Sequence, residues 1–440
     1  MSQTIRVLLS PVRLTIGRLS PPLRILVSLV IGLVAGIAAA RAAPEAALRW
    51  VAAIEPVGTM WLNGLRMTIV PLVVGLLVTG IAQTAEAARA GRLATRSILA
   101  FLAILWGTSA MAGLVTPMLL ELWPLSHDAT TALRASFRAA APAGEMPSFA
   151  SFITALIPVN PVSAAANDAF LPLIVFTTVF AFAVTRLPEE QRTVLTGVFR
   201  ALADAMLIVI TWVLWLAPLG VFALSYAVGA RAGTAAFGAL LHYVAIVSAV
   251  GALVWALAYP VGVIGGRVRL RDLIRATGPA QAVAISTQSS LASLPAMLRG
   301  TEALKVPVAT AGVVLPLAVA LFRATGPAMN LAVAIYVGHV FGVPLGPTQL
   351  AAGVAAAALT TMGAVSLPGT ISYISSIAPI AVVMGVPVEP LALLVAVETL
   401  PDIVRTLGNV TMDVAVTAAI AERADARDGA SEADALLEQG

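Results

Sequence analysis

The sequence contains no cysteine and few charged residues, and both absences restrict the kind of protein that it encodes. Without cysteine the chain forms no disulfide, has no thiolate nucleophile and offers no sulfur ligand of that type to a metal. Only 11% of its 440 residues are Asp, Glu, Lys or Arg, against about a quarter in soluble domains. Because 59% of the chain is hydrophobic, a water-soluble fold is excluded.

The hydrophobic residues lie in long runs, which predict transmembrane helices. Runs of ~20 apolar residues suit helices that cross a bilayer, whereas barrel strands are about 10 residues long and alternate in polarity. Backbone groups inside a bilayer must also bond within their own segment. The expected ordinary spans are residues 22–41, 56–83, 95–121, 166–186, 194–227 and 236–266. The predicted fold class is therefore an all-α polytopic membrane protein.

The net charge of +4 comes from basic residues that mark one side of the membrane. They lie in the N-terminal segment and in the loops after the second, fourth and sixth spans. The loop residues are Arg89, Arg92, Arg96, Arg186, Arg192, Arg267, Arg269, Arg271 and Arg275. By the positive-inside rule these loops are cytoplasmic, so the charge orients the chain and does not indicate nucleic-acid binding. The N-terminal segment 1–21 and the acidic tail 422–440 are then cytoplasmic, in an inner (plasma) membrane.

From residue 276 onward, Gly, Pro, Ser and Thr repeatedly interrupt the apolar segments. Two interruptions, at residues 288–295 and 360–369, lie within segments too short on either side to span alone. This is typical of re-entrant helical hairpins, and two kinked ordinary helices are the alternative. The expected elements are hairpins at about 272–303 and 348–383, followed by helices at about 307–342 and 386–421. Such paired broken segments predict a transporter binding site near the membrane midplane.

The last apolar segment carries a row of polar residues at membrane depth. They are Glu398, Asp402, Arg405, Asn409 and Asp413. At about 100° per residue they fall at roughly 0°, 40°, 340°, 20° and 60° on a helical wheel, so they share one face, with Thr406 at its edge. Charges at that depth are costly and mark candidate functional sites. A guanidinium binds carboxylates bidentately, so a solute with a carboxylate and an amine fits this face; a structural ion-pair ladder is the alternative.

Residues 402–413 are similar to D-x-x-R-T-x-x-N-V-x-x-D, the last-helix signature of the dicarboxylate/amino acid:cation symporters, which include the excitatory amino-acid transporters. Supporting matches are residues 67–72 (MTIVPL), 157–161 (IPVNP) and 217–223 (APLGVFA). The resemblance runs from about residue 55 to 421. It implies a glutamate-transporter-like fold with eight transmembrane helices, two re-entrant hairpins and inverted repeats.

The resemblance also implies a homotrimer in which transport domains move against a fixed scaffold. The implied scaffold is helices 1–2 at 22–94 and helices 4–5 at 145–227. The implied transport domain is helix 3 at 95–121 together with residues 236–421, which hold helix 6, both hairpins, helix 7 and helix 8.

Site roles follow from the resemblance, position by position. It implies that Arg405 binds the side-chain carboxylate of the solute and Asp402 its amino group, with Thr406 and Asn409 as further polar contacts. The residues implied to close over the solute are Ser289, Ser290, Ser366 and Gly369. The residues implied to bind sodium are Asp413, Asn409, Asn330, Thr108 and Ser109. No cofactor is expected, and the coupling ion is Na⁺, H⁺ or both.

Three departures from the family pattern concern the coupling ions. The family's Asn-Met-Asp is matched by Met329-Asn330-Leu331, so an acid is missing, and Arg323 stands where relatives are apolar. Glu398 stands where relatives usually carry Asp. It is a candidate proton carrier, since burial favours the neutral form of a carboxyl group. Fewer sodium ions per solute are therefore expected.

The predicted function is symport of a small acidic amino acid, similar to glutamate or aspartate, across the lipid bilayer. A C4-dicarboxylate symporter is the nearest alternative, and Asp402 favours the amino acid. A passive anion channel is a further alternative. An intramembrane hydrolase would need Ser289 or Ser290 in contact with a base such as His339; no nucleophile motif surrounds these residues, so we expect no enzyme.

Overall fold

The computed structural model describes residues 21–89, 91–126, 130–131, 134, 157–167, 169–233, 235–363 and 369–421, and these ranges contain helices but no strands. The first-half helices are α2 (Pro21–Ala42), α3 (Pro44–Arg66), α4 (Ile69–Arg89), α5 (Arg92–Leu122), α8 (Pro161–Ala166), α9 (Phe170–Val184), α10 (Glu189–Trp215) and α11 (Ala217–Ala232). The second-half helices are α12 (Ala235–Pro260), η1 (Val261–Gly265), α13 (Leu270–Thr287), α14 (Ser290–Ala303), α15 (Val308–Leu321), α16 (Gly326–Phe341), α17 (Pro347–Gly363), α18 (Gly369–Val383), α19 (Leu391–Leu394), η2 (Val395–Val397) and α20 (Thr399–Ile420).

Several of these helices match the expected spans. Within the described ranges, seven helical segments are long and apolar enough to cross a membrane. They are Leu23–Ala42, Pro44–Glu86, Arg92–Leu122, Glu189–Trp215, Phe237–Gly265, Thr310–Phe341 and Thr399–Ile420. The span expected at 166–186 corresponds to a shorter apolar helix, Pro172–Val184. This helical, strand-free architecture is that of a polytopic membrane protein.

Two expected spans are divided, in each case next to a proline. The span expected at 56–83 begins earlier, at Pro44, and breaks between α3 and α4 one turn before Pro71. The span expected at 194–227 is α10 followed by the separate helix α11, which has Pro218 in its first turn. Proline has no N–H to donate to the carbonyl four residues back, so the helical bonding is interrupted at both places.

The second half contains two helical hairpins, each followed by a broken helix. In the first hairpin α13 and α14 pack together and are joined by Gln288 and Ser289 alone. In the second, α17 packs on α18, and the connection at 364–368 lies outside the described residues. The helix expected at 307–342 is interrupted between α15 and α16. The helix expected at 386–421 is built from α19, η2 and α20.

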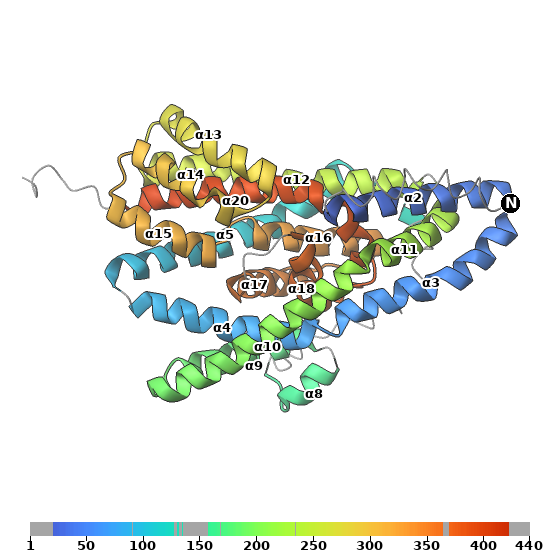
Figure 1. Ribbon diagram of the computed structural model, residues 1–440, viewed down its shortest axis with the longest axis horizontal. Coiled ribbons are helices and arrows are strands. Elements are labelled where there is room, and N and C mark those ends of the chain that lie inside the picture. The colour runs from blue at the N-terminus through green and yellow to red at the C-terminus, as the bar shows by residue number, and fades with distance from the viewer. Residues whose placement is uncertain are drawn as a thin grey trace, which may run out of the picture.

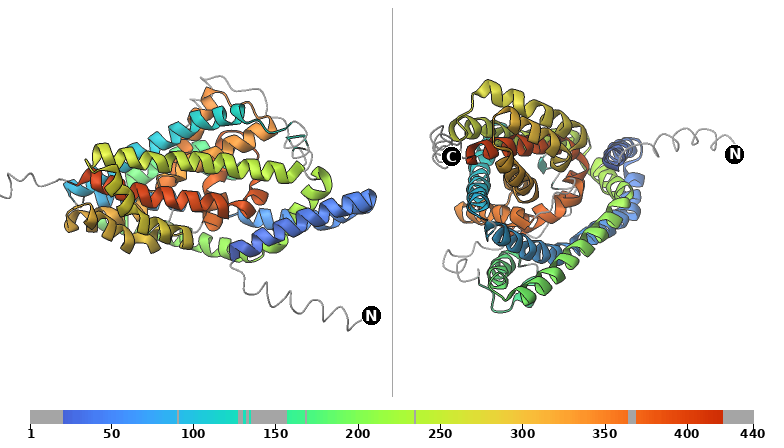
Figure 2. Two further views of the ribbon diagram at one scale, coloured as in Figure 1. Left: turned by 90° about the horizontal axis from the view of Figure 1, so that it is seen from above. Right: turned by 60° about the vertical axis from the view of Figure 1, so that its left-hand side comes forward.

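The helices form two groups that lie side by side (Figures 1 and 2). The first group is a curved layer in which α11 packs on α2 and α3, and α4 packs on α9 and α10. The second is more compact: α20 packs on α12, α13 and α14, while α16 packs on α5 and α18. Helix α17 contacts both α4 and α5 and so bridges the groups. The polar row of α20 therefore lies inside the second group.

The contact between α2 and α11 depends on small residues. Gly32 and Gly36 are one turn apart on α2, and a Cβ atom at either would overlap the backbone or side chains of α11. On α11, Gly229 has the same relation to the backbone of Leu33. Small residues at this spacing allow two helix backbones to approach closely, which is how helices associate where lipid removes the hydrophobic driving force.

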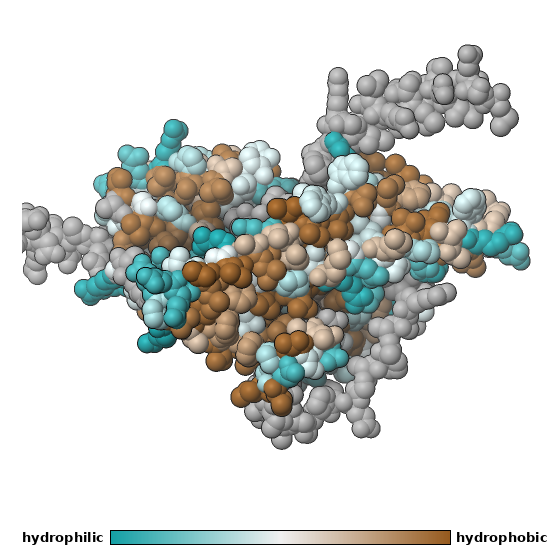
Figure 3. All heavy atoms as spheres, turned by 60° about the horizontal axis from the view of Figure 1, so that its bottom comes forward, coloured by the Kyte–Doolittle hydropathy of each residue, from teal (hydrophilic) through white to brown (hydrophobic). Residues whose placement is uncertain are grey.

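The outer surface is apolar over much of its extent. Figure 3 shows hydrophobic residues gathered over one face, with polar residues toward its margins. Large apolar side chains are exposed on α5 and α10, among them Leu114, Met118, Trp212 and Trp215. A water-soluble monomer rarely exposes a continuous patch of this kind. Lipid or a second protein subunit is the environment that such a face requires.

The close α2–α11 contact predicts that even one added methyl group is destabilising. We expect Gly36→Ala to lower the free energy of unfolding by about 1–3 kcal/mol, since the new Cβ meets the Tyr226 carbonyl oxygen. Gly107→Ala in α5 is the matched control, because its Cβ meets nothing within 4 Å. Thermal unfolding in detergent measures both variants. Equal stability of the two proteins would show that the contact is looser than described.

Candidate functional site

The six polar residues of the last segment are all buried inside the second group of helices. Asp402, Arg405, Thr406, Asn409 and Asp413 lie on α20. Glu398 is the residue between η2 and α20, and it is only 1% exposed. The regular helix from Thr399 onward keeps the expected common face, so these side chains meet the neighbouring helices rather than lipid.

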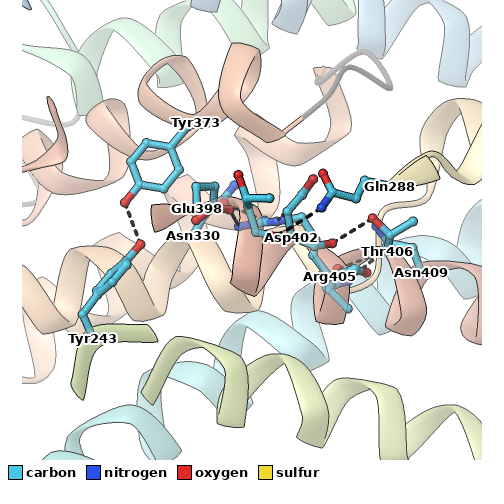
Figure 4. Close-up of polar contacts among 11 residues, drawn as sticks. Tyr243, Gln288, Asn330, Tyr373, Glu398, Asp402, Arg405, Thr406 and Asn409 are labelled. Atoms are coloured by element: carbon cyan, nitrogen blue, oxygen red, sulfur yellow. Dashed lines mark hydrogen bonds and ion pairs between the residues drawn. The ribbon is translucent and has the colours of Figure 1, made fainter. Parts of the chain in front are cut away.

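Arg405 is at the centre of this cluster, and other side chains of the protein already bind its guanidinium. Nη2 donates to Oε1 of Glu398 at 2.8 Å, and Nη1 donates to Oδ1 of Asn330 at 2.9 Å. Nε lies 3.4 Å from Oδ1 of Asp402, as an ion pair. Figure 4 shows these groups converging from α20, from the start of that helix and from α16. A solute carboxylate that binds Arg405 must therefore replace one of them.

Arg323 adds a second guanidinium to the cluster. It lies in the non-helical stretch between α15 and α16 and interacts electrostatically with both Asp402 and Arg405. Two arginines and two carboxylates therefore share this region. With all four groups ionised, their formal charges cancel, which lowers the cost of burying them.

Asn409 connects α20 to the same non-helical stretch between α15 and α16. Its Oδ1 accepts hydrogen bonds from the backbone N–H of Thr325 at 3.0 Å and from the Thr325 hydroxyl at 2.8 Å. The Thr325 hydroxyl also contacts the carbonyl oxygen of Arg405 at 3.0 Å. Asn409 thus stabilises the interrupted backbone, since an unpaired N–H there would be costly.

Asp413 belongs to this row, and the other described groups leave both of its carboxylate oxygens unsatisfied. It is fully buried, and neither carboxylate oxygen has a hydrogen-bond partner among the described residues. A buried carboxylate in that state requires either a proton or a bound cation. Asp413 is therefore the best candidate cation ligand.

The second expected sodium region fits a cation less well. Thr108 and Ser109 lie on α5, where their hydroxyls donate to the carbonyl oxygens of Ala324 and Val354. The side chain of Leu331 lies between Gly113 of α5 and α17. An apolar group therefore occupies the position of the missing acid, and Asn330 is bonded to Arg405. Among the described residues no three His, Asp or Glu side chains form a metal cluster.

The first hairpin brings its tip to the start of α20. Gln288, in the left-handed conformation with φ 51°, donates through Nε2 to the carbonyl oxygen of Thr399 at 3.2 Å. Ser289 caps α14, its hydroxyl accepting from the N–H of Ala292 at 3.2 Å, and Ser290 begins that helix. The contact of the hairpin tip with the start of α20 is thus made by Gln288, not by the serines that were implied to close over the solute. Its signal in the sequence was its place in the turn, at a position where the resemblance implies a frequent Ser or Arg.

The second hairpin is described only in its arms. Gly369 is the first residue of α18, and Ser366 lies outside the described residues. The hydroxyl of Thr406 bonds the carbonyl oxygen of Asp402, within its own helix, at 2.8 Å. No hydrogen bond in the described part of the chain joins Ser289 to His339, so the geometry of a hydrolase is not present there.

Sequence reasoning missed two tyrosines that border the site. The hydroxyl oxygens of Tyr243 on α12 and Tyr373 on α18 are 2.7 Å apart, and both side chains are buried. Both lie within electrostatic reach of Glu398. They lie 130 residues apart on α12 and α18, and nothing in the sequence indicates that the two meet.

Comparisons with known proteins match most of the chain to transporters of acidic solutes. The model of the sodium:dicarboxylate symporter family matches residues 22–423. The chain is 27% identical over 414 residues to the proton/glutamate-aspartate symporter of Escherichia coli K12, covering 91% of this chain and 92% of that protein. It is 28% identical over 418 residues to C4-dicarboxylate transport protein 1 of Pseudomonas aeruginosa UCBPP-PA14, covering 90% and 87%. It is 26% identical over 370 residues to the proton/sodium-glutamate symport protein of Bacillus subtilis 168, covering 81% and 83%.

Proposed function

The chain belongs to the sodium:dicarboxylate symporter family, and from this premise we propose that it takes up an acidic amino acid, similar to glutamate or aspartate, together with a coupling cation. The family resemblance expected from residues 402–413 is confirmed. As a member of a symporter family, the protein is a membrane transporter and not an enzyme. Its transport is driven by coupling ions, Na⁺, H⁺ or both, rather than by a cofactor.

The buried guanidinium of Arg405 is the observation that carries the proposal. Its partners Glu398 and Asp402 are two carboxylates within 3.4 Å. An incoming solute carboxylate takes the place of Glu398 on Nη2, because both groups bind a guanidinium in the same way. Asp402 then receives the amino group of the solute. Thr406 lies one residue beyond Arg405, and the first hairpin tip covers the start of the same helix.

Glu398 supplies the link to protons. When a solute carboxylate displaces it from Arg405, its negative charge has no equivalent partner in the buried cluster. Taking up a proton removes that charge at less cost than leaving a buried anion unpaired. Relatives named as proton/glutamate-aspartate and proton/sodium-glutamate symporters support proton coupling in this chain. Asp413 serves as the remaining candidate cation ligand.

A C4-dicarboxylate is the second candidate solute, and Arg323 is the feature that favours it. Its guanidinium lies within electrostatic reach of Asp402 and Arg405. Two arginines in one site match the two carboxylates of such a solute, and the relative from Pseudomonas aeruginosa is named for that class. We favour the amino acid because Asp402 supplies an acceptor for an amine and would repel a second carboxylate.

The arrangement of the chain in the membrane is proposed from the charge pattern and the helix groups. Eight spanning helices and two re-entrant hairpins would place both termini in the cytoplasm, in the inner membrane. The curved layer of α2–α4 and α9–α11 would be the fixed scaffold, and the second group the mobile transport domain. The exposed apolar residues of α10 offer a surface for two further copies in a homotrimer.

Uptake into proteoliposomes tests the proposed function directly. We expect the protein to concentrate glutamate or aspartate when a proton or sodium gradient is imposed, which a passive channel cannot do. Arg405→Ala should abolish uptake of every solute with a distal carboxylate, because its bidentate partner is lost. Wild-type rates in Arg405→Ala for aspartate, glutamate and dicarboxylates would contradict the assignment of this site.

Asp402→Asn separates the two solute classes. Because a buried amine loses its ionised partner, we expect amino-acid binding to weaken by about 2–5 kcal/mol. Dicarboxylates have no amine and should bind the variant at least as well as the wild type. Isothermal titration with aspartate and with succinate measures both affinities. Equal losses for the two solutes, or a wild type that binds only the dicarboxylate, would refute an amine-binding role for Asp402.

The missing acid at Leu331 predicts a reduced sodium requirement. We expect fewer than three sodium ions per solute, with protons supplying part of the coupling, because the region of Thr108 and Ser109 lacks a carboxylate. Reversal potentials measured in proteoliposomes at several sodium and pH gradients give the stoichiometry. Asp413→Asn should remove the remaining sodium dependence and leave the proton dependence intact. A stoichiometry of three sodium ions would rule this reading out.

A further inference from the structure

Two buried tyrosine hydroxyls beside Glu398 have no role in the solute site described above. Tyr243 comes from α12 and Tyr373 from the second arm of the second hairpin, 130 residues later. Their hydroxyl oxygens are 2.7 Å apart, and the side chains are 0% and 2% exposed. Figure 4 shows the two hydroxyls pointing toward each other, on the Glu398 side of the cluster. Both tyrosines are thus buried away from bulk solvent.

A count of hydrogen atoms shows that the pair can serve a third group. Each hydroxyl donates one hydrogen bond and also accepts. One tyrosine therefore donates to the other, which leaves one hydrogen for a further acceptor. The carboxyl group of Glu398 lies close to the Tyr243 hydroxyl. Arg405 donates to Oε1 of this carboxyl group. The other oxygen, Oε2, is buried and makes no hydrogen bond of normal geometry. Oε2 is thus the acceptor that the pair lacks.

The charged and titratable groups around Glu398 come from three helices. Arg405 and Asp402 face it from α20, Tyr243 faces it from α12, and Tyr373 faces it from α18. Among these, Arg405 favours the ionised carboxylate and Asp402 opposes it. The tyrosines are neutral, and their hydroxyls can either donate to the carboxylate or accept from the carboxylic acid. They are the neighbours that can adapt to both forms.

We propose that Tyr243 and Tyr373 are positioning residues that keep Glu398 hydrogen-bonded in both of its protonation states, and so set the pH range over which solute transport is coupled to protons. The inference rests on the proposed function, in which Glu398 carries the proton. With Glu398 ionised, Tyr373 donates to Tyr243, and Tyr243 donates to Oε2. With Glu398 protonated, the carboxylic acid donates to Tyr243, and Tyr243 donates to Tyr373.

The change between these two arrangements involves one proton and no other transfer. Glu398 gains the proton on Oε2, while each tyrosine keeps its own hydrogen and only rotates it about the C–O bond. Because the Tyr243 bond to the ionised carboxylate is charge-assisted, it is stronger than the bond to the neutral acid. The pair therefore favours release of the proton. Removing the Tyr243 hydroxyl should make Glu398 retain its proton to higher pH.

The experiment is the pH profile of aspartate homoexchange in proteoliposomes that hold the full-length protein. Homoexchange requires solute binding and translocation but no net proton movement, so variants remain measurable. We expect Tyr243→Phe to shift the midpoint of the profile upward by about one pH unit, tenfold in proton affinity. Tyr373→Phe should shift it in the same direction by less, because Tyr243 loses only its partner.

Two controls separate this role from a structural one. Tyr226→Phe removes another buried tyrosine hydroxyl, on α11, and should leave the profile unchanged. In a Glu398→Gln background the transition due to Glu398 should be absent, and neither Tyr243→Phe nor Tyr373→Phe should alter the pH profile that remains. If Tyr243→Phe does not fold, Tyr373→Phe in both backgrounds gives the same comparison.

Each remaining outcome decides the proposal. Unshifted profiles in both tyrosine variants, with exchange intact, overturn it and leave the proposed symport standing. Equal shifts with and without Glu398 also overturn it, because the tyrosines would then act through another group. The proposed function is judged on the wild type alone: absence of aspartate uptake, or uptake that ignores pH, refutes that function or its proton coupling before any tyrosine variant is measured.

Discussion

The positive charge of Arg405, buried in an apolar interior, is the constraint on which the rest of the site depends. Leaving such a charge without its partner costs about 3–5 kcal/mol, so the fold must bring partners to it. Glu398, Asp402 and Asn330 do so from the start of α20, from α20 itself and from α16. The same requirement holds α16 and α20 in register, because a shift of either helix would separate a guanidinium nitrogen from its acceptor.

The interruptions in the helices are a second consequence of placing a polar site in such surroundings. An unwound backbone at membrane depth is tolerated only where protein groups satisfy it. Between α15 and α16 this is achieved by Asn409, which accepts from the N–H and the hydroxyl of Thr325. The break in turn places Arg323 within electrostatic reach of the cluster. Stability of the backbone and assembly of the site are therefore provided by the same contacts.

Local patterns in the sequence predicted much of this arrangement. They could not predict which side chains on separate helices would meet. The common face of Glu398, Asp402, Arg405, Asn409 and Asp413 follows from the helical period alone, and all five prove to be buried. The breaks near Pro71 and Pro218 were not predicted, since the expected spans ran through them. The internal ion pair of Arg405 with Glu398, and the contact of Tyr243 with Tyr373, depend on how separate helices pack. No spacing along the chain encodes such a meeting.

In the proposed function, the pairing of Arg405 with Glu398 links solute binding to proton binding without any large rearrangement of the site itself. Glu398 neutralises the guanidinium of Arg405 through an ion pair of 2.8 Å. A solute carboxylate and the ionised Glu398 compete for the same nitrogen, whereas the solute and a protonated Glu398 do not. Binding of the anion therefore raises the affinity for a proton, and by reciprocity a bound proton raises the affinity for the anion by the same factor. A buried carboxylate that can lose its partner is thus sufficient, in physical terms, to couple the two.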